Sequence, residues 1–188
     1  EGKIYKNWAY IDEIPHEARL ERRGLDFGYT NDPSALVDIY YYNGGYIIDE
    51  ALYQKGMTNK QIADFVLNCE YPSTMIVADS AEPKSIDELR SYGVNIIPVI
   101  KGKDSVAQGI QFVQDQRISV TKNSYNVIKE YRNYLFEVDK DGKVTNDPSP
   151  IFNHAMDAIR YGFDALRKVD TSELDIPNDQ KLFKGGFY

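Results

Sequence analysis

The stretch RRGLDFGYTNDPSALVDIYYYNGGYIIDEAL, residues 22–52, decides the fold. Ala35–Tyr42 and Tyr46–Tyr53 are rich in β-branched and aromatic residues, which predicts two strands, and Arg23–Gly28 before them is a shorter strand candidate. Asn43-Gly44 is a strong hairpin signal, because a tight turn needs positive φ angles that Asn and Gly tolerate. The stretch therefore predicts a meander of three antiparallel strands.

Beyond this meander, helix and strand patterns alternate along the chain. Helices are expected over Thr58–Asn68, Pro83–Tyr92, Ser105–Gln114, Ser124–Tyr134 and Ile151–Lys168. Short strands are expected over Thr74–Ala78, Asn95–Ile100 and Ile118–Thr121, and a hairpin over Phe136–Val144. Strands separated by helices usually pair in parallel. The expected fold is therefore α/β, with a mixed sheet of three antiparallel strands followed by parallel strands, flanked by helices.

Length and composition fit one compact domain. The chain has 188 residues, of which 42% are hydrophobic, and no apolar run reaches the roughly 18 residues that a membrane span needs. We expect an irregular lead-in over residues 1–21, one domain over 22–169 and a polar tail over 170–188. The single cysteine, Cys69, excludes a disulfide within the chain and a cysteine-based zinc site. The net charge of −7 argues against a protein that holds nucleic acid by bulk charge alone.

Asp26 stands out within the first strand. Gly24, Asp26 and Gly28 point to one face of that strand, and Leu25 and Phe27 point to the other. Glycine weakens a strand, so two glycines beside an acid indicate that something approaches the backbone closely. The alternative is an edge strand that leads into the next turn.

Asp79 follows the apolar strand candidate that ends at Ala78, and a helix begins soon after it. Groups at the carboxyl ends of parallel strands commonly line a ligand crevice. The alternative is that Asp79 or Ser80 only caps the next helix.

The segment NHAMDAIRYG, residues 153–162, places a third acid on a late helix. His154 and Asp157 are three residues apart and therefore share a helix face. Ala155 and Ala158 are small enough to let this helix lie close to a sheet. A carboxylate among apolar neighbours is costly unless it is paired or binds a metal ion. The alternative is a His–Asp pair at the surface.

The three acids are more informative together than singly. Phosphodiester hydrolysis needs an activated water and neutralisation of the charge on the phosphate, and two divalent ions roughly 4 Å apart provide both. Magnesium prefers oxygen ligands and usually takes one or two carboxylates. Asp26, Asp79 and Asp157 are ligands of this kind.

Three segments in this order resemble the nuclease domain of the large terminase subunits of tailed phages, which has a ribonuclease H-like fold. They are residues 22–52, MIVADSAEPKSIDELRSYGVNIIPVIKGKDSVAQGIQ at 75–111, and NHAMDAIRYG at 153–162. The resemblance implies a metal-dependent endonuclease that cuts double-stranded DNA during genome packaging. Its implied cofactor is Mg²⁺ or Mn²⁺, with two ions at the site.

The resemblance also implies roles for individual residues. Asp26, Asp79 and Asp157 match the acidic metal ligands of the family, and His154 matches a histidine found at the site of some members. Lys101 and Lys103 lie where the family has a basic loop, and they are expected to contact DNA. An ordinary exposed loop is an equal alternative for the two lysines.

Large terminase subunits also carry an ATPase domain, but this chain has no G-x-x-x-x-G-K-[ST] phosphate loop. The chain is therefore expected to be the nuclease portion alone. The implied partners are an N-terminal ATPase domain, the portal and the small terminase subunit, with no membrane. The implied location is the host cytoplasm, at the procapsid.

Other classes of protein stay open at this stage. A junction resolvase or a transposase shares the acid pattern, since fold alone does not settle function. A non-catalytic docking module of a packaging motor would carry the same acids as surface groups. An actin-like ATPase half shares the order of elements, but the glycine-rich phosphate loops of that class are missing.

Overall fold

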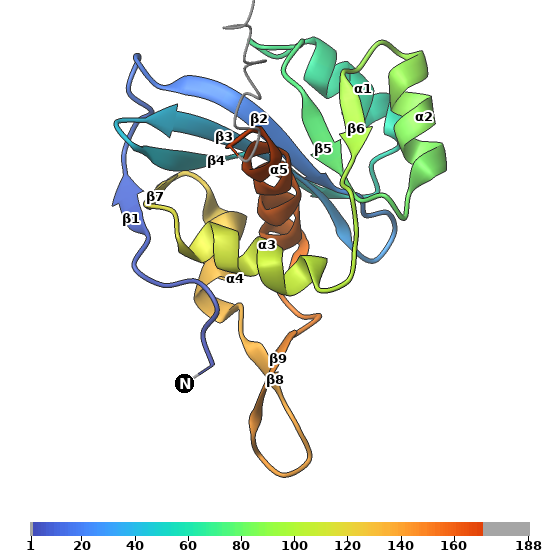
Figure 1. The fold of residues 1–188 in the computed structure, drawn as a ribbon. Helices are drawn as coiled ribbons and strands as arrows, with labels where there is room; N and C mark the ends of the chain where they lie inside the picture. Colours follow the sequence, from blue (N-terminus) through green and yellow to red (C-terminus); the bar gives the residue numbers. More distant parts are fainter. Residues whose placement is uncertain (1, 171–188) are drawn as a thin grey trace, which may run out of the picture.

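The computed structural model describes residues 2–170, and Figure 1 shows their fold. The strands are β1 (Ala9–Ile11), β2 (Arg19–Asp26), β3 (Pro33–Tyr42), β4 (Gly45–Lys55), β5 (Ile76–Ala78), β6 (Ile96–Pro98), β7 (Ile118–Thr121), β8 (Phe136–Val138) and β9 (Val144–Pro148). The helices are α1 (Asn59–Leu67), α2 (Pro83–Ser91), α3 (Ser105–Gln114), α4 (Tyr125–Asn133) and α5 (His154–Asp170).

A seven-stranded mixed sheet forms the centre, with the strand order β1-β7-β4-β3-β2-β5-β6. Strand β3 pairs antiparallel with β2 and with β4, and the other neighbours in the sheet pair in parallel. The expected mixed sheet and its antiparallel meander are therefore confirmed. Because only β3 runs in the opposite direction, the carboxyl ends of the other six strands lie at one edge of the sheet.

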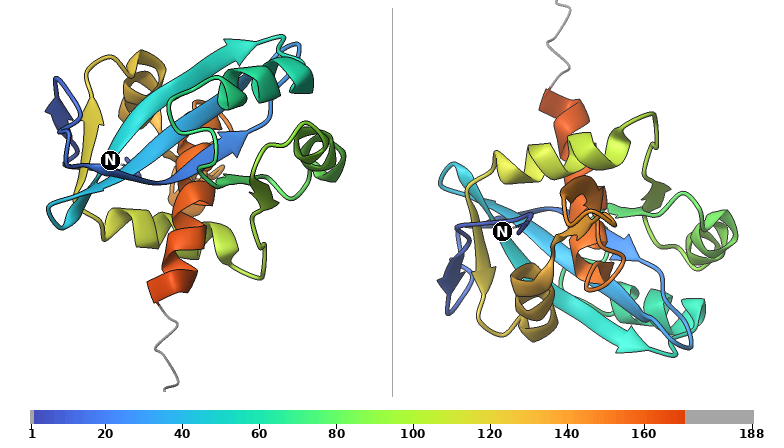
Figure 2. Two further views of the ribbon diagram at one scale, coloured as in Figure 1. Left: turned by 90° about the horizontal axis from the view of Figure 1, so that it is seen from above. Right: turned by 90° about the horizontal axis from the view of Figure 1, so that it is seen from below.

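Helices cover both faces of this sheet. Helix α5 crosses one face between α3 and α4, and α1 and α2 lie together near β5 and β6 (Figures 1 and 2). Leu25, Leu36 and Ile76 belong to the hydrophobic core that the sheet shares with α1 and α2. Ile39 and Val120 belong to the larger core beneath α3, α4 and α5.

The helix α1 begins as the sequence predicts. Thr58 precedes the helix, and its hydroxyl oxygen accepts a hydrogen bond from the backbone N–H of Gln61 at 3.2 Å. The Gln61 side chain in return accepts a bond from the backbone N–H of Thr58 at 2.9 Å. This reciprocal arrangement, a capping box, satisfies two donors that the start of a helix leaves unpaired.

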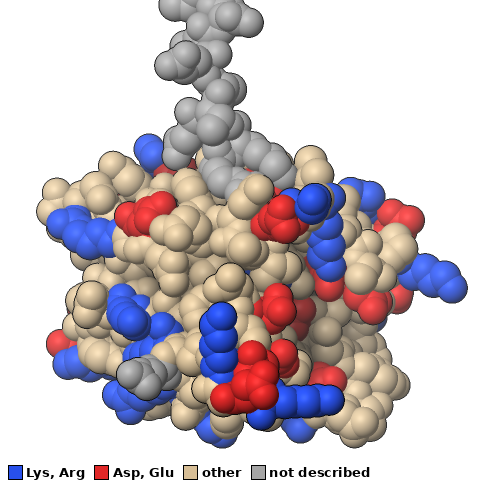
Figure 3. All heavy atoms as spheres, turned by 60° about the horizontal axis from the view of Figure 1, so that its bottom comes forward, with Lys and Arg blue, Asp and Glu red and all other residues tan. Residues whose placement is uncertain are grey.

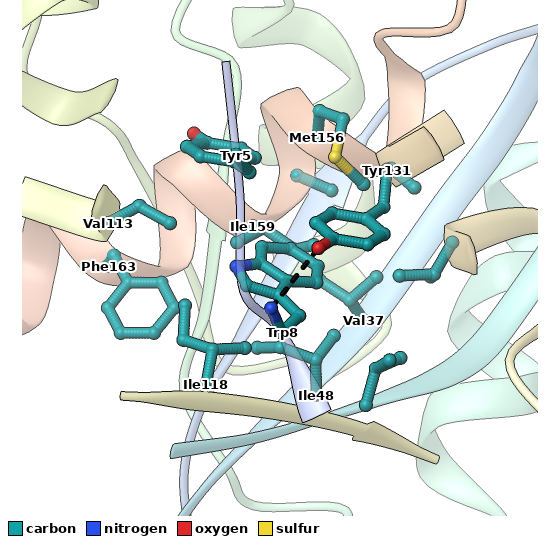
Figure 4. Packing of buried hydrophobic residues seen from close by; sticks show 14 of the residues in the cluster. Tyr5, Trp8, Val37, Ile48, Val113, Ile118, Tyr131, Met156, Ile159 and Phe163 are labelled. Atoms are coloured by element: carbon teal, nitrogen blue, oxygen red, sulfur yellow. Dashed lines mark hydrogen bonds between the residues drawn. The ribbon is translucent and has the colours of Figure 1, made fainter. Parts of the chain in front are cut away.

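The expectation of an irregular lead-in over 1–21 is wrong for two short stretches and otherwise agrees with the described residues. Ala9–Ile11 form β1, which pairs with β7, and β2 already begins at Arg19. Trp8 stacks on Tyr131 of α4 at a centroid distance of 4.4 Å, and the Trp8 backbone N–H donates to the Tyr131 hydroxyl at 3.1 Å (Figure 4). Partners more than a hundred residues away order this segment, and no local pattern reveals them.

The C-terminal elements differ from the expectation in their bounds. Helix α5 begins at His154 instead of Ile151, because Phe152 has a left-handed φ of 58° that interrupts a helix. The hairpin of β8 and β9 forms a separate two-stranded sheet that extends to Pro148. The polar tail expected over 170–188 lies outside the described residues, apart from Asp170 at the end of α5. Among the described helices, none is long and apolar enough to cross a membrane.

Candidate active site

Asp26 and Asp79 lie side by side at the carboxyl edge of the sheet. Asp26 is the last residue of β2, and Asp79 directly follows β5. These strands are parallel neighbours, and Leu25 pairs with Ala78 in their register. Paired strands lie about 4.8 Å apart. Asp26 and Asp79, which follow this pair, therefore lie next to each other at the edge of the sheet.

Glycine in β2 lets α5 bring the third acid there. A Cβ atom on Gly24 would lie only 1.7 Å from the carbonyl oxygen of Ala158, and one on Gly162 would lie 3.5 Å from the Cα of Gly24. The helix backbone therefore rests directly on the strand backbone. This confirms the expected close approach at Gly24, and it brings Asp157 over the end of β2.

One face of α5 contacts Asp26 and Asp79. His154, Asp157 and Tyr161 are spaced by three and four residues, so they share that face. His154 Nδ1 lies 3.0 Å from Asp26 Oδ2, and the Tyr161 hydroxyl donates to Asp79 Oδ2 at 3.3 Å. The role of Tyr161 was not predicted, although its position one turn beyond Asp157 was a signal in the sequence.

The acids also influence one another electrostatically. Burial, helped by the negative charges of Asp157 and Asp79, raises the pKa of Asp26 to about 6 against the lowering effect of His154. The bond to Asp26 raises the pKa of His154, although burial opposes this. Burial also acts to raise the pKa of Asp79, but hydrogen bonds from Lys101 and from the Ala81 N–H outweigh it and hold this pKa below its usual value.

A basic side chain contacts each carboxylate. His154 binds Asp26, Lys101 forms an ion pair with Asp79, and Arg160 donates to Asp157 Oδ1 at 2.8 Å. Within residues 2–170, no group of three or more His, Cys, Asp or Glu side chains is arranged as it stands to hold a metal ion. The donor chemistry nevertheless fits a divalent cation. Three carboxylates supply the hard oxygen ligands that Mg²⁺ and Mn²⁺ prefer, and their mutual repulsion favours a positive charge between them.

The two predicted lysines differ in position. Lys101, in the loop after β6, reaches Asp79 and is 43% exposed. Lys103 is exposed in the same loop, and no hydrogen bond or ion pair joins it to another described residue. The structure thus brings Lys101 to the acids and leaves Lys103 at the surface. Figure 3 shows acidic side chains near the middle of the face turned forward, with Lys and Arg side chains around them.

Two acids that cap helices, the buried Glu130 and the half-buried Glu50, were not expected. Glu130 of α4 is 1% exposed, and its Oε2 accepts bonds from the backbone N–H groups of Ala155 and Met156 at 2.6 and 3.3 Å. It thereby caps the start of α5, where His154 lies. Glu50 of β4 caps α4 in the same way, through the N–H groups of Asn126 and Val127. Both caps come from distant parts of the chain, so local cap patterns could not indicate them.

Comparison with known proteins identifies the family. The family model described as the terminase RNase H-like domain matches residues 26–165, which is most of the chain. The large terminase subunit of Bacillus phage SPP1 is 40% identical over 154 residues, covering 76% of this chain and 35% of the relative. The large terminase subunit of phage PBSX from Bacillus subtilis strain 168 is 30% identical over 160 residues, covering 81% and 36%.

Solved structures agree with these relatives. The nuclease domain of the SPP1 large terminase, determined with bound Mn, matches with a TM-score of 0.75 and 32% identity, covering 86% of this chain and 97% of that domain. The P22 large terminase nuclease domain matches with a TM-score of 0.65 at 15% identity, covering 88% and 93%. The second match concerns the fold alone. Together they confirm the expected ribonuclease H-like fold.

This chain spans about a third of the length of the curated relatives that it matches. The matched part is the nuclease portion of the SPP1 protein, since that domain is covered almost completely. The family model and the SPP1 relative each cover most of the chain. The chain therefore belongs to the terminase RNase H-like domain family of phage large terminase subunits.

Proposed function

We propose that this domain is a divalent-metal-dependent endonuclease that cuts double-stranded viral DNA during genome packaging. The observation that carries the proposal is the placement of Asp26 and Asp79 at the ends of two adjacent parallel strands, with Asp157 on a helix that rests directly on β2. Family membership supports the reaction class. The SPP1 nuclease domain determined with Mn and the nuclease of phage G20c determined with Mg support the choice of cation.

Asp26, Asp79 and Asp157 would hold Mg²⁺ or Mn²⁺, two ions in all, once Lys101 releases Asp79. Two divalent ions at such a site activate a water and neutralise the charge on the phosphate and on the leaving oxygen. Tyr161 orients Asp79 through its hydroxyl, and Arg160 fixes Asp157 from the next turn of α5. The protein thus holds its ligands in place before substrate arrives.

His154 would orient Asp26 and contact the substrate. An ionised Asp26 can only accept a hydrogen bond, so Nδ1 of His154 carries the proton between them at 3.0 Å. Nε2 of His154 then points toward Asp32, whose Oδ1 lies 3.6 Å away. With Asp32 beside it, this nitrogen would hold or deliver a proton at an oxygen of the phosphate. Lys101 and Lys103 would bind the DNA backbone beside Asp79.

The remaining parts of a packaging motor would lie outside this chain. We propose that an ATPase domain of the same protein, the portal and the small terminase subunit are its partners, and that it acts in the host cytoplasm at the procapsid. The relatives are phage large terminases, and the large terminase of a thermophilic bacteriophage has been determined in complex with ADP and with ATP-γ-S. Such partners would compensate for the net charge of −7 when DNA binds.

Cleavage of supercoiled plasmid by the purified chain tests this function. We expect slow, largely sequence-nonspecific cleavage with Mg²⁺ or Mn²⁺ and none with EDTA. Asp26→Asn should abolish cleavage, whereas the matched control Asp12→Asn, which changes an exposed acid paired with Lys122, should cut like the unaltered chain. Cleavage that persists in EDTA or in Asp26→Asn would contradict the proposal. No cleavage by the folded, unaltered chain at high metal concentration would favour a docking module.

A further inference from the structure

A groove of about 420 Å³ begins at His154. It lies on the β3 and β4 side of β2, whereas Asp79 lies on the β5 side. The lining residues that matter here come from four separate parts of the chain: Asn31, Lys55, Lys129, Ile151, Phe152 and His154. The groove therefore continues away from the three acids in the direction opposite to Lys101.

The exposed charge of this groove includes two lysines without a counter-ion. Lys55 at the end of β4 and Lys129 on α4 are both exposed, and neither forms an ion pair with a described residue. The carboxylate of Glu130 also borders the groove, but it is buried, and the Tyr53 hydroxyl and two backbone amides bind its oxygens. Asp32 is the exposed acid of the lining, and it faces His154.

An apolar edge lies beside these lysines. Ile151 and Phe152 are 62% and 37% exposed, respectively. Phe152 has a left-handed φ of 58°, a conformation that is uncommon for a residue other than glycine and that costs free energy. Its ring lies 5.6 Å from Nζ of Lys129. A groove whose exposed lysines lie beside exposed apolar side chains suits a sugar–phosphate chain.

We propose that this groove binds the backbone of a DNA strand on one side of the cut. Lys55 and Lys129 contact phosphates, and Ile151 and Phe152 pack against the sugars. A strand whose scissile phosphate lies at the three acids then passes His154 into the groove, while Lys101 lies on the other side of the acids. The inference rests on the proposed nuclease function, because it names how the substrate of that site is held.

Anisotropy of a fluorescently labelled DNA duplex tests the groove. The titrations use the whole chain in EDTA, where a metal-dependent nuclease cannot cut, at several salt concentrations. We compare the double variant Lys55→Ala/Lys129→Ala with the charge-keeping double variant Lys55→Arg/Lys129→Arg. The matched control is Arg19→Ala, whose side chain is 73% exposed at the opposite end of β2 from Asp26.

Loss of two phosphate contacts should raise the Kd of the alanine double variant by roughly 3- to 10-fold at low salt. The plot of log association constant against log salt concentration should also become less steep, its negative slope shrinking in magnitude by about 1 to 2. The arginine double variant should stay within about twofold of the unaltered chain, as should the Arg19 control. These results would support the groove as a phosphate site.

Binding by the alanine double variant that equals the control would overturn the inference. So would a complete lack of duplex binding by the unaltered chain at low salt. Plasmid cleavage with Mg²⁺, measured in parallel, separates the two proposals. Metal-dependent cleavage by the unaltered chain together with unchanged binding in the alanine variant would leave the nuclease function standing and remove only the groove.

Discussion

The surroundings of Asp26 disfavour the ionised form of its carboxyl group. Its side chain is 15% exposed, and burial with the neighbouring acids raises its pKa from 3.8 to about 6. Between these two values the unfolded chain has released the proton while the folded chain still holds it. The free energy of unfolding therefore falls as pH rises from about 4 to about 6, and it stays lower above this window. Asp26 is thus retained at the expense of stability, as expected of a functional group.

Asp26→Asn should therefore stabilise the fold without divalent metal. Asparagine resembles the protonated acid, so we expect a gain of about 1–3 kcal/mol in the free energy of unfolding at pH 8 and little change at pH 4. Urea unfolding of both proteins in EDTA at the two pH values measures this. A variant that is equally destabilised at pH 4 and pH 8 would show that the carboxylate carries no such penalty.

At the scale of single residues, the sequence indicates the acids better than their partners. Asp26 and Asp79 are recognisable because an acid at the end of an apolar strand is conspicuous, and Asp157 because apolar neighbours surround it. Tyr161 and Arg160 were not assigned, since a tyrosine or an arginine on a helix is usually explained by packing or solvation. Their roles depend on distances to Asp79 and Asp157 that only the folded chain provides.

Helix α5 depends on a cap that another helix supplies. Glu130 binds two of its first backbone amides and also accepts a bond from the Tyr53 hydroxyl at 2.7 Å. A carboxylate at a helix start is favoured by the helix dipole, and a buried N–H that loses its acceptor costs free energy. Glu130 therefore fixes the turn of α5 that carries His154.

Glu130→Ala should destabilise the protein by about 2–4 kcal/mol, because buried donors lose their acceptor. Glu130→Gln retains an acceptor oxygen and should lose less than half of that amount. Glu137→Ala, at an exposed position of β8, is the control and should change stability by no more than about 0.5 kcal/mol. Chemical unfolding gives all three values, and equal stability of Glu130→Ala and the control would refute the capping role.

The contact between β2 and α5 makes a second prediction at this scale. Gly24→Ala would place a methyl group 1.7 Å from a backbone oxygen of α5, which no side-chain movement can relieve. We expect a loss of about 3 kcal/mol or more. Gly102→Ala, where no atom lies within 4 Å of an added Cβ, should stay within about 0.5 kcal/mol. A Gly24→Ala protein as stable as this control would mean that α5 does not rest on the strand.

Most elements could be predicted because their signals are local. The bounds of α3 and β7 agree with the expected ones, and Asn43-Gly44 does form the turn of the β3–β4 hairpin, both residues having positive φ. Strand β1 was missed because its pairing with β7 joins residues far apart in sequence. The start of α5 was misplaced because Phe152 adopts a conformation that its residue type does not indicate.

At the scale of the whole molecule, the site lies where one sheet edge collects the carboxyl ends of six strands. Asp26 and Asp79 come from adjacent strands at this edge, and α5 adds Asp157 from above the sheet. Lysines lie on both sides of the acids, in the loop after β6 and along the groove at the end of β4. These lysines would supply local positive charge to the proposed DNA path across a protein whose net charge is negative.

The central claim is that the three carboxylates together hold divalent metal, and calorimetric titration with Mn²⁺ tests it most directly. The unaltered chain and the Asp12→Asn control should bind Mn²⁺ alike. Asp26→Asn, Asp79→Asn and Asp157→Asn should each weaken binding on the order of tenfold or more, because each removes an oxygen ligand. If the three variants bind Mn²⁺ as tightly as the control, or if the folded unaltered chain binds none, the acids are not a metal site.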